Sequence, residues 1–108
     1  MLDTNDRPVV AWQDATPYEL DTGAEVCEVY VKRFDGASWQ EVGSGSASGT
    51  GVSNGHLTTS LFYPALVLDT SDNPVVAWAD RYAYVARFDG GAWQTLPQLT
   101  AGYLRGRF

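Results

Sequence analysis

The sequence predicts an all-β protein that consists of two copies of one antiparallel, four-stranded unit. The segments Leu2–Asp14 and Leu68–Asp80 share ten of thirteen residues at an offset of 66 positions. A second pair of segments, Tyr30–Gln40 and Tyr84–Gln94, shares eight of eleven residues at an offset of 54. Because the two offsets differ by 12, the first copy carries about a dozen additional residues between its halves. One structural unit is therefore used twice, with a loop of variable length in its middle.

The first copy alternates strand patterns with turn patterns. We expect the chain to begin at the end of a strand, Met1–Thr4, and then to turn at Thr4–Pro8, where Asn and Asp bond back to nearby backbone and Pro fixes φ. The β-branched and aromatic residues of Val9–Gln13 predict a strand that is covered on both faces. A polar loop at Asp14–Glu25 then leads to a further strand at Val26–Phe34.

Asp-Gly pairs indicate a hairpin in each copy, at Asp35-Gly36 and at Asp89-Gly90. A type I′ turn needs positive φ at both central residues, which Asp-Gly favours, so we predict this turn at both places. The outer strands are expected to follow at Ala37–Val42 and Ala92–Leu96. The strand that leads into the second hairpin is expected at Tyr84–Phe88.

The segment between the copies, Gly43–Gly55, is rich in Gly and Ser, which in isolation is typical of a flexible linker. Between two copies of one unit it is better interpreted as the crossing from the outer strand of the first to the inner strand of the second, expected at Ala65–Leu68. Tyr103–Phe108 is expected to form one more short strand. No segment has helical periodicity of useful length.

Four short antiparallel strands, repeated at a pitch of about 55 to 65 residues, are typical of a β-propeller blade. We expect blade 1 at about residues 1–43, the crossing segment at 44–62, blade 2 at about 63–97 and a C-terminal tail at 98–108. Neighbouring blades cover each other, which explains strands that are apolar on both faces. Propellers usually have about four to eight blades, so two blades need further partners to complete the core.

These motifs resemble bacterial propeller repeats of the sialidase-like, or Asp-box-like, superfamily. The resemblance rests on Pro64–Asp69, Asn73–Trp78, Tyr84–Gly90 and Trp93, covers most of the chain, and implies the fold rather than a function. An Asp box places Gly two residues and Trp five residues after the Asp. Both motifs of this chain are one residue tighter.

Two-blade chains are expected to assemble into a closed ring, in which three chains give six blades; four chains giving eight is the alternative. Met1-Leu2 leaves the first blade without an inner strand. We expect Tyr103–Phe108 of a neighbouring copy to supply this strand by exchange, which removes the open edge between subunits. A rival interpretation is that the chain is a fragment whose partners were other blades of a longer protein.

Composition excludes several classes of partner. The 108 residues allow one domain at most, and the net charge of −6 argues against nucleic acid and against anionic membrane surfaces. Cys27 is the only cysteine, so no internal disulfide is expected. No apolar run approaches the roughly 20 residues of a membrane span, and the polar N-terminus lacks the pattern of a signal peptide. No cofactor is indicated, and the composition leaves the compartment open.

The four tryptophans occupy equivalent positions in pairs. We predict that Trp12 and Trp78 form the core between blades, although an aromatic platform for sugars is the alternative. Trp39 and Trp93 follow the hairpin turns, nearer a rim, where turn packing is favoured over sugar contact. Small propeller lectins built from two-blade chains bind sugars between blades with Trp, Arg and a carboxylate, and this chain resembles them in architecture only.

Charged residues next to the strands are further candidates for ligand binding. Arg33 and Arg87 each precede Phe-Asp-Gly, and an arginine at a rim needs a carboxylate or carbonyl partner. We predict structural pairing with an aspartate such as Asp35 or Asp14, with ligand contact as the alternative. Asp14 and Asp80 end the strands that carry a tryptophan, at loop ends of the kind where propellers place their ligands.

Neither a metal site nor a catalytic centre is predicted. The acidic runs at residues 3–6 and 69–73 are interpreted as Asx-type turns, since Ca²⁺ needs six to eight convergent oxygens. His56 has no nucleophile at a motif spacing. We therefore predict a non-catalytic propeller module for assembly or binding, with carbohydrate as the leading ligand class and the loop Asp14–Glu25 as the source of specificity. The alternatives are part of a sialidase-like enzyme ring and a purely structural repeat.

Overall fold

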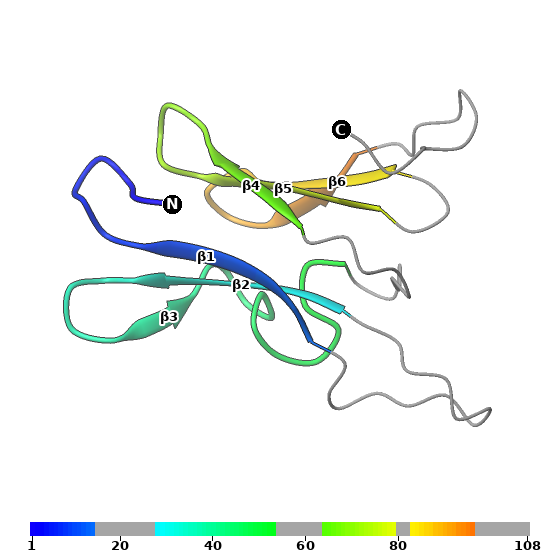
Figure 1. Ribbon diagram of the computed structural model, residues 1–108, viewed down its shortest axis with the longest axis horizontal. Helices are drawn as coiled ribbons and strands as arrows, with labels where there is room; N and C mark the ends of the chain where they lie inside the picture. The colour runs from blue at the N-terminus through cyan, green and yellow to red at the C-terminus, as the bar shows by residue number, and fades with distance from the viewer. Residues whose placement is uncertain (15–27, 54–63, 80–82, 97–108) are drawn as a thin grey trace.

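The computed structural model describes residues 1–14, 28–53, 64–79 and 83–96, which form two antiparallel sheets and no helix (Figure 1). The first sheet has the order β1-β2-β3, with strands Val9–Asp14, Glu28–Phe34 and Trp39–Glu41. The second sheet has the order β4-β5-β6-β7, with strands Ala65–Leu68, Pro74–Ala79, Ala83–Phe88 and Trp93–Thr95. The described residues contain no helix long and apolar enough to span a membrane. The prediction of an all-β protein is confirmed.

The two sheets repeat one pattern of strand pairing. Trp12 lies opposite Tyr30 in the β1–β2 ladder, and Trp78 lies opposite Tyr84 in the β5–β6 ladder. The rings of each pair lie 5.8 Å apart between centroids. Cross-strand aromatic pairs of this kind stabilise a particular register. The two copies found in the sequence are therefore two copies of one sheet, aligned residue by residue.

The first sheet has three strands and a single bridge, in agreement with the expectation that it keeps only the end of its inner strand. Leu2 bridges to Pro8, which is the counterpart of the pairing between Leu68 and Pro74 in the second sheet. Met1 extends this bridge: its amino group donates to the Val9 carbonyl at 3.0 Å, and the Val9 amide donates to the Met1 carbonyl at 2.7 Å. The bridge thus corresponds to the last two residues of β4.

The turns before β1 and β5 follow the predicted Asx-type geometry. The Asp3 carboxylate accepts hydrogen bonds from the Asn5 and Arg7 amides at 2.8 and 3.0 Å, and Asp69 accepts the equivalent two in the second sheet. These bonds favour the ionised carboxylate and lower the pKa of both side chains, with the Arg7 amide as the largest cause for Asp3 and the Asn73 amide for Asp69. The last aspartate of each turn has positive φ, 57° at Asp6 and 62° at Asp72.

The predicted type I′ hairpin turns are wrong. Phe34 pairs with Trp39, so the loop contains four residues, and only the glycine of the Asp-Gly pair, Gly36, has positive φ. The Asp35 carboxylate accepts hydrogen bonds from the Ala37 and Ser38 amides at 2.8 and 2.9 Å. Asp89 makes the same bonds in the second sheet. The aspartates therefore act through their side chains, and β3 and β7 are shorter than predicted because the loop takes four residues.

The hydrophobic core lies between the two sheets. Its buried members come from both sheets and from the segment between them: Val9, Val29, Val31, Val42, Val52, Val76, Trp78 and Ala86. Because side chains alternate along a strand, each sheet turns one face to this core and the other away from it. In the first sheet the core face carries Val9, Ala11, Val31 and Val42, and the outer face carries Val10, Trp12, Lys32 and Trp39. In the second sheet the core face carries Val76, Trp78, Ala86 and Trp93, and the outer face carries Val75, Ala77, Val85 and Leu96.

Candidate binding cleft between the two sheets

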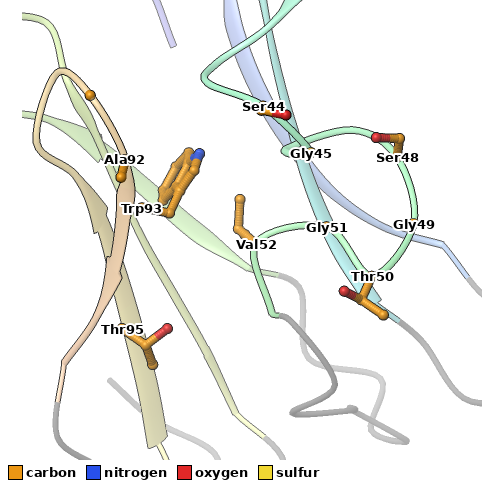
Figure 2. Close-up of a pocket in the computed structure, with 11 residues that line it drawn as sticks. Ser44, Gly45, Ser48, Gly49, Thr50, Gly51, Val52, Ala92, Trp93 and Thr95 are labelled. Carbon is orange, nitrogen blue, oxygen red and sulfur yellow. The ribbon is translucent and has the colours of Figure 1, made fainter.

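A cleft of about 520 Å³ opens between the second sheet and the segment that follows the first sheet. Figure 2 shows β7 and its hairpin on one side and the Gly/Ser segment on the other, with the Trp93 indole projecting between them. The cleft falls within the usual size range of small-molecule sites. Its described lining consists of small and hydroxylated residues around one indole: Ser44, Gly45, Ser48, Gly49, Thr50, Gly51, Val52, Gly91, Ala92, Trp93 and Thr95.

The Glu41 carboxylate fixes the first part of the Gly/Ser segment. It accepts hydrogen bonds from the Ser48 hydroxyl at 2.8 Å, the Ala47 amide at 3.0 Å and the Gly45 amide at 3.3 Å. These donors, the Ser48 hydroxyl first, lower the pKa of Glu41 below its ordinary value. The carboxylate is therefore ionised at neutral pH and holds residues 44–48 in a turn, although the sequence of this segment is typical of a flexible linker.

Ser46 and Gly51 place the segment against the edge of β2. The Ser46 hydroxyl donates to the Val31 carbonyl at 2.6 Å and accepts from the Val42 amide at 2.8 Å. Gly51 has a φ of 59°, and a Cβ at this position would lie 2.2 Å from the Val29 carbonyl oxygen. Glycine is required there for its backbone conformation and for space. The segment thus continues the outer edge of the first sheet and forms one wall of the cleft.

Trp93 holds the other wall in place. Its indole nitrogen donates a hydrogen bond to the Val42 carbonyl at 2.6 Å, which links the second sheet directly to the first. Its ring packs against Phe88 with centroids 5.6 Å apart, and Phe88 in turn lies against Gly43, where an added Cβ would come within 2.6 Å of the Phe88 ring. The indole N–H is therefore satisfied within the protein, and the ring itself is what Trp93 offers to a ligand.

The chemistry of the cleft is polar but neutral. Hydroxyl groups from serine and threonine and the backbone of the glycines surround the apolar indole, and the described lining contains no charged side chain. An uncharged ligand with an apolar patch and several hydroxyl groups matches such a lining, because each hydroxyl both donates and accepts hydrogen bonds. Anionic ligands and metal ions find no counter-charge or ligand set among these described residues.

Trp39, the counterpart of Trp93, lies in a different environment. It is 46% exposed and contacts Phe34, with ring centroids 5.5 Å apart. Together with Val10, Trp12 and Lys32 it lines an open apolar hollow of about 300 Å³ on the outer face of the first sheet. Trp78 is fully buried in the core as predicted, whereas Trp12 lies in this hollow. The sequence prediction treated the members of each tryptophan pair alike, and the structure separates them.

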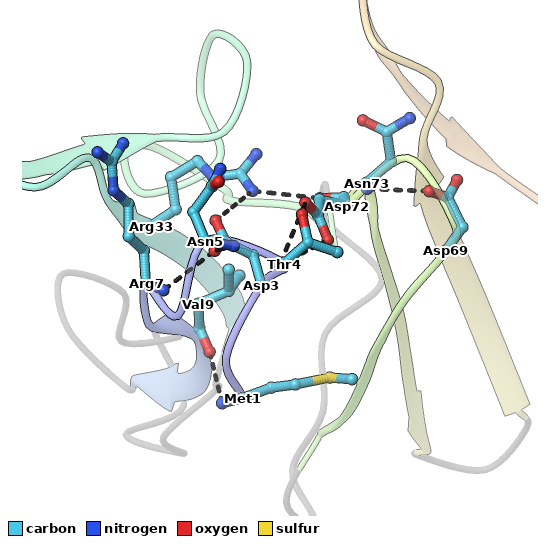
Figure 3. Close-up of polar contacts among 10 residues, drawn as sticks. All are labelled: Met1, Asp3, Thr4, Asn5, Arg7, Val9, Arg33, Asp69, Asp72 and Asn73. Atoms are coloured by element: carbon cyan, nitrogen blue, oxygen red, sulfur yellow. Dashed lines mark hydrogen bonds and ion pairs between the residues drawn. The ribbon is translucent and has the colours of Figure 1, made fainter.

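Arg33 and Arg87 face the turns that precede β1 and β5, and Figure 3 shows Arg33. Arg33 lies 3.5 Å from the Asp3 carboxylate and donates to the Asp72 carbonyl at 3.2 Å, so its partners are neither Asp35 nor Asp14 as expected. Arg87 lies 3.8 Å from Asp69 and is more exposed. Each arginine thus contacts the aspartate of its own sheet, and Arg33 also reaches the turn of the other sheet.

The remaining predicted positions fall partly outside the described residues. Asp14 ends β1 opposite Glu28, at the end of the ladder, and does not line the cleft. Asp80, Cys27, His56 and the tail from Tyr103 to Phe108 lie outside the described residues, as does the Asp14–Glu25 loop beyond Asp14 itself.

Of the six candidate ligand-binding residues, the structure describes all but Asp80, and among these five only Trp93 lines the cleft. The sequence interpretation missed the contribution of Ser44 to Val52, which it treated only as a crossing. The sequence does contain an indication that this segment has a fixed shape, because Glu41 is followed by Ser and Gly residues that supply hydrogen-bond donors for its carboxylate.

Comparison of the chain with family models, with curated proteins and with solved structures found no match.

Proposed function

We propose that this chain is a non-catalytic β-propeller module that binds a neutral carbohydrate in the cleft between its two blades, the blades being the two sheets described above. In this proposal several copies assemble into a ring, three copies being favoured and four the alternative. The observation that carries the ligand class is the cleft itself: the Trp93 ring is surrounded by hydroxyls and glycine backbone, and no charged side chain is found in the described lining.

A sugar ring fits this lining for specific reasons. One side of many pyranoses presents C–H groups that pack on an aromatic face, and the rim presents hydroxyls that exchange hydrogen bonds with serine, threonine and backbone groups. Ser44 and Thr95 approach from opposite walls, as Figure 2 shows, so a bound sugar would contact both sheets. Because Glu41 and Ser46 already fix the wall, little conformational entropy would be lost on binding.

The alternative of a sialidase-like enzyme receives less support from the same residues. A sialic acid carboxylate needs arginines that converge on it, whereas Arg33 and Arg87 are each paired with the aspartate of their own sheet. The proposed ligand is therefore neutral rather than acidic, and the proposed module binds without turnover.

Binding of the full chain to a panel of neutral and sialylated glycans, with titration calorimetry on the glycans that bind, tests this proposal. T95V removes one hydroxyl from the cleft and should weaken binding about two- to tenfold, the value of one neutral hydrogen bond. A92F places a ring in the opening of the cleft and should abolish binding. S71A is the matched control, since Ser71 is an exposed residue in the turn before β5, away from the cleft.

Two results would reject the proposal. The first is absence of binding to any glycan at millimolar concentration, which rejects the ligand class. The second is glycan binding that A92F and T95V leave unchanged, which rejects the cleft. Release of free sugar from a bound glycan would favour the enzymatic alternative.

A further inference from the structure

Each sheet has one face packed on the core and one more open face, and the pattern is reversed between the two sheets. On the more open faces Tyr30, Ala79 and Ala83 are nevertheless buried. The outer face of the first sheet is equivalent by sequence to the core face of the second: Val10, Trp12, Lys32 and Trp39 correspond to Val76, Trp78, Ala86 and Trp93. Likewise, the core face of the first sheet is equivalent to the outer face of the second. The contact within the chain therefore joins two surfaces whose equivalents are both left open.

Equivalent side chains of the two sheets differ in solvent exposure in the way that this reversal predicts. Val76 is fully buried, whereas its equivalent Val10 is 40% exposed. Val42 is buried, whereas its equivalent Leu96 is 40% exposed. The first sheet thus leaves open a tryptophan-bearing apolar face, and the second sheet leaves open the aliphatic face that would fit it. Contiguous open faces of this kind usually mark sites of association.

Three polar contacts join the two sheets within the chain, and Figure 3 shows the two that involve Asp72. The Trp93 indole donates to the Val42 carbonyl, the Thr4 amide and hydroxyl donate to the Asp72 carboxylate, and Arg33 donates to the Asp72 carbonyl. The Trp93 bond is donated by the second sheet to the first, and the Thr4 and Arg33 bonds are donated by the first sheet to the second. Together they provide a template for the contact that the open faces would make.

We infer that the outer face of the first sheet docks on the outer face of the second sheet of another copy, with the geometry of the contact inside the chain. This inference rests on the assembly contained in the proposed function and names its surface. In the assembled state the Trp39 indole would donate to the Leu96 carbonyl of the next copy. On the opposite side of the chain, the Thr70 hydroxyl and Arg87 would in turn meet Asp6 of the preceding copy.

The backbone conformation and the exposure of the residues on the open faces are compatible with these contacts. Asp6 and Asp72 have similar positive φ, 57° and 62°, so the backbone of the two turns has the same left-handed conformation at the contact residue. Arg87 is half exposed, whereas Arg33, which already makes its contact across the sheets, is 27% exposed. The faces depart from equivalence at Lys32 in place of Ala86, at Leu96 in place of Val42, and at Leu66, which has no counterpart in the first sheet. Lys32 lies opposite Glu41 on the neighbouring strand, at the rim of the face.

A contact of this kind is heterologous, because two different surfaces meet. Heterologous contacts between copies close into rings or continue into fibres, and they do not form the self-complementary dimers of twofold symmetry. Cross-linking of single-cysteine variants separates these cases. Cys27 is first replaced by serine, and then D6C and T70C are made in separate chains. The double variant T4C/D72C, built on the contact inside the chain, shows that a short thiol–thiol cross-linker spans the distance.

A mixture of D6C and T70C chains is expected to give covalent dimers in high yield, whereas neither variant alone should cross-link to itself. Self-linking of D6C, or of T70C, would indicate an isologous dimer and would overturn the inference. Absence of cross-linking in the mixture, when T4C/D72C reacts, would also overturn it. If particles larger than one chain persist in either case, the proposed assembly stands and only its surface is wrong.

A second measurement tests the same surface without cysteines. W39A should raise the dissociation constant of the assembly by about 30-fold, as expected for a buried tryptophan at the centre of an interface. W39F keeps the ring and loses only the indole N–H, so it should raise the constant about two- to tenfold. Sedimentation of both variants over a dilution series measures these changes, and an assembly unchanged by W39A would contradict the inference.

Discussion

The buried hydroxyl of Ser46 is the most specific stabilising contact of the Gly/Ser segment. It bridges the Val42 amide and the Val31 carbonyl, and in the second sheet the equivalent groups bond directly, from the Leu96 amide to the Val85 carbonyl at 2.8 Å. S46A removes the bridge and leaves a buried donor and a buried acceptor unpaired. Each unpaired group costs about 1–3 kcal/mol. We expect S46A to lower the free energy of unfolding by about 2–4 kcal/mol, because local relaxation recovers part of the loss.

Urea unfolding followed by tryptophan fluorescence measures this change. At an m value of about 1–3 kcal/mol per M, a loss of about 3 kcal/mol shifts the midpoint by roughly 1–3 M. The protein concentration must be the same for every variant, since assembly adds to the apparent stability. S44A is the control, because Ser44 is exposed and is expected to change stability by no more than about 0.5 kcal/mol. A midpoint for S46A equal to that of S44A would refute the role assigned to the hydroxyl.

Three further predictions concern the same framework. G51A should destabilise the chain by several kcal/mol more than G49A, because both have positive φ but only at Gly51 would a Cβ meet a carbonyl oxygen; equal urea midpoints would contradict this. The backbone N–H bonds to Asp3, Asp69, Asp35 and Asp89 hold their folded pKa values below the ordinary 3.8, so the unfolded state binds more protons in acid. The contribution of these aspartates to the free energy of unfolding should be complete above about pH 5 and should be lost as the pH falls below 3.8 through their folded pKa values. The free energy of unfolding should fall less steeply with decreasing pH in D35N/D89N than in the unaltered chain, and parallel curves for the two proteins would contradict this. E41Q should speed hydrogen exchange at the Gly45 and Ala47 amides relative to Q40A, and unchanged exchange rates would argue against Glu41 as the organiser of the cleft wall.

The repeats in the sequence predicted the sheets well, because strand pairing follows local pattern. The pairs Trp12–Tyr30 and Trp78–Tyr84 occupy matching positions in both copies, so register was encoded twice. The Asx-type turns were predictable for the same reason, since Asp3 and its neighbours form bonds over two to four residues. Contacts of this range can be inferred from short motifs.

Long-range contacts were predicted poorly. Arg33 was expected to pair with an aspartate such as Asp35 or Asp14, whereas its carboxylate partner is Asp3, 30 residues away in the chain. The cleft depends on Glu41 and Ser46, whose side chains give a Gly/Ser segment a fixed shape that composition does not reveal. The turn type at Asp35 was also missed, because the carboxylate accepts backbone amides instead of the residue adopting positive φ. In each case the structure depends on a side chain that bonds to a distant part of the chain or to backbone outside the regular strand ladders.

The mass of the particle in solution tests the central claim most directly, which is that two sheets per chain are an incomplete set of blades. Native mass spectrometry or light scattering across a dilution series should give three or four times the chain mass of 11.8 kDa. Dissociation into single chains should occur together with a change in the fluorescence of Trp39, which would lose its contact with the next copy. A particle of 11.8 kDa that unfolds cooperatively at every concentration would contradict the account.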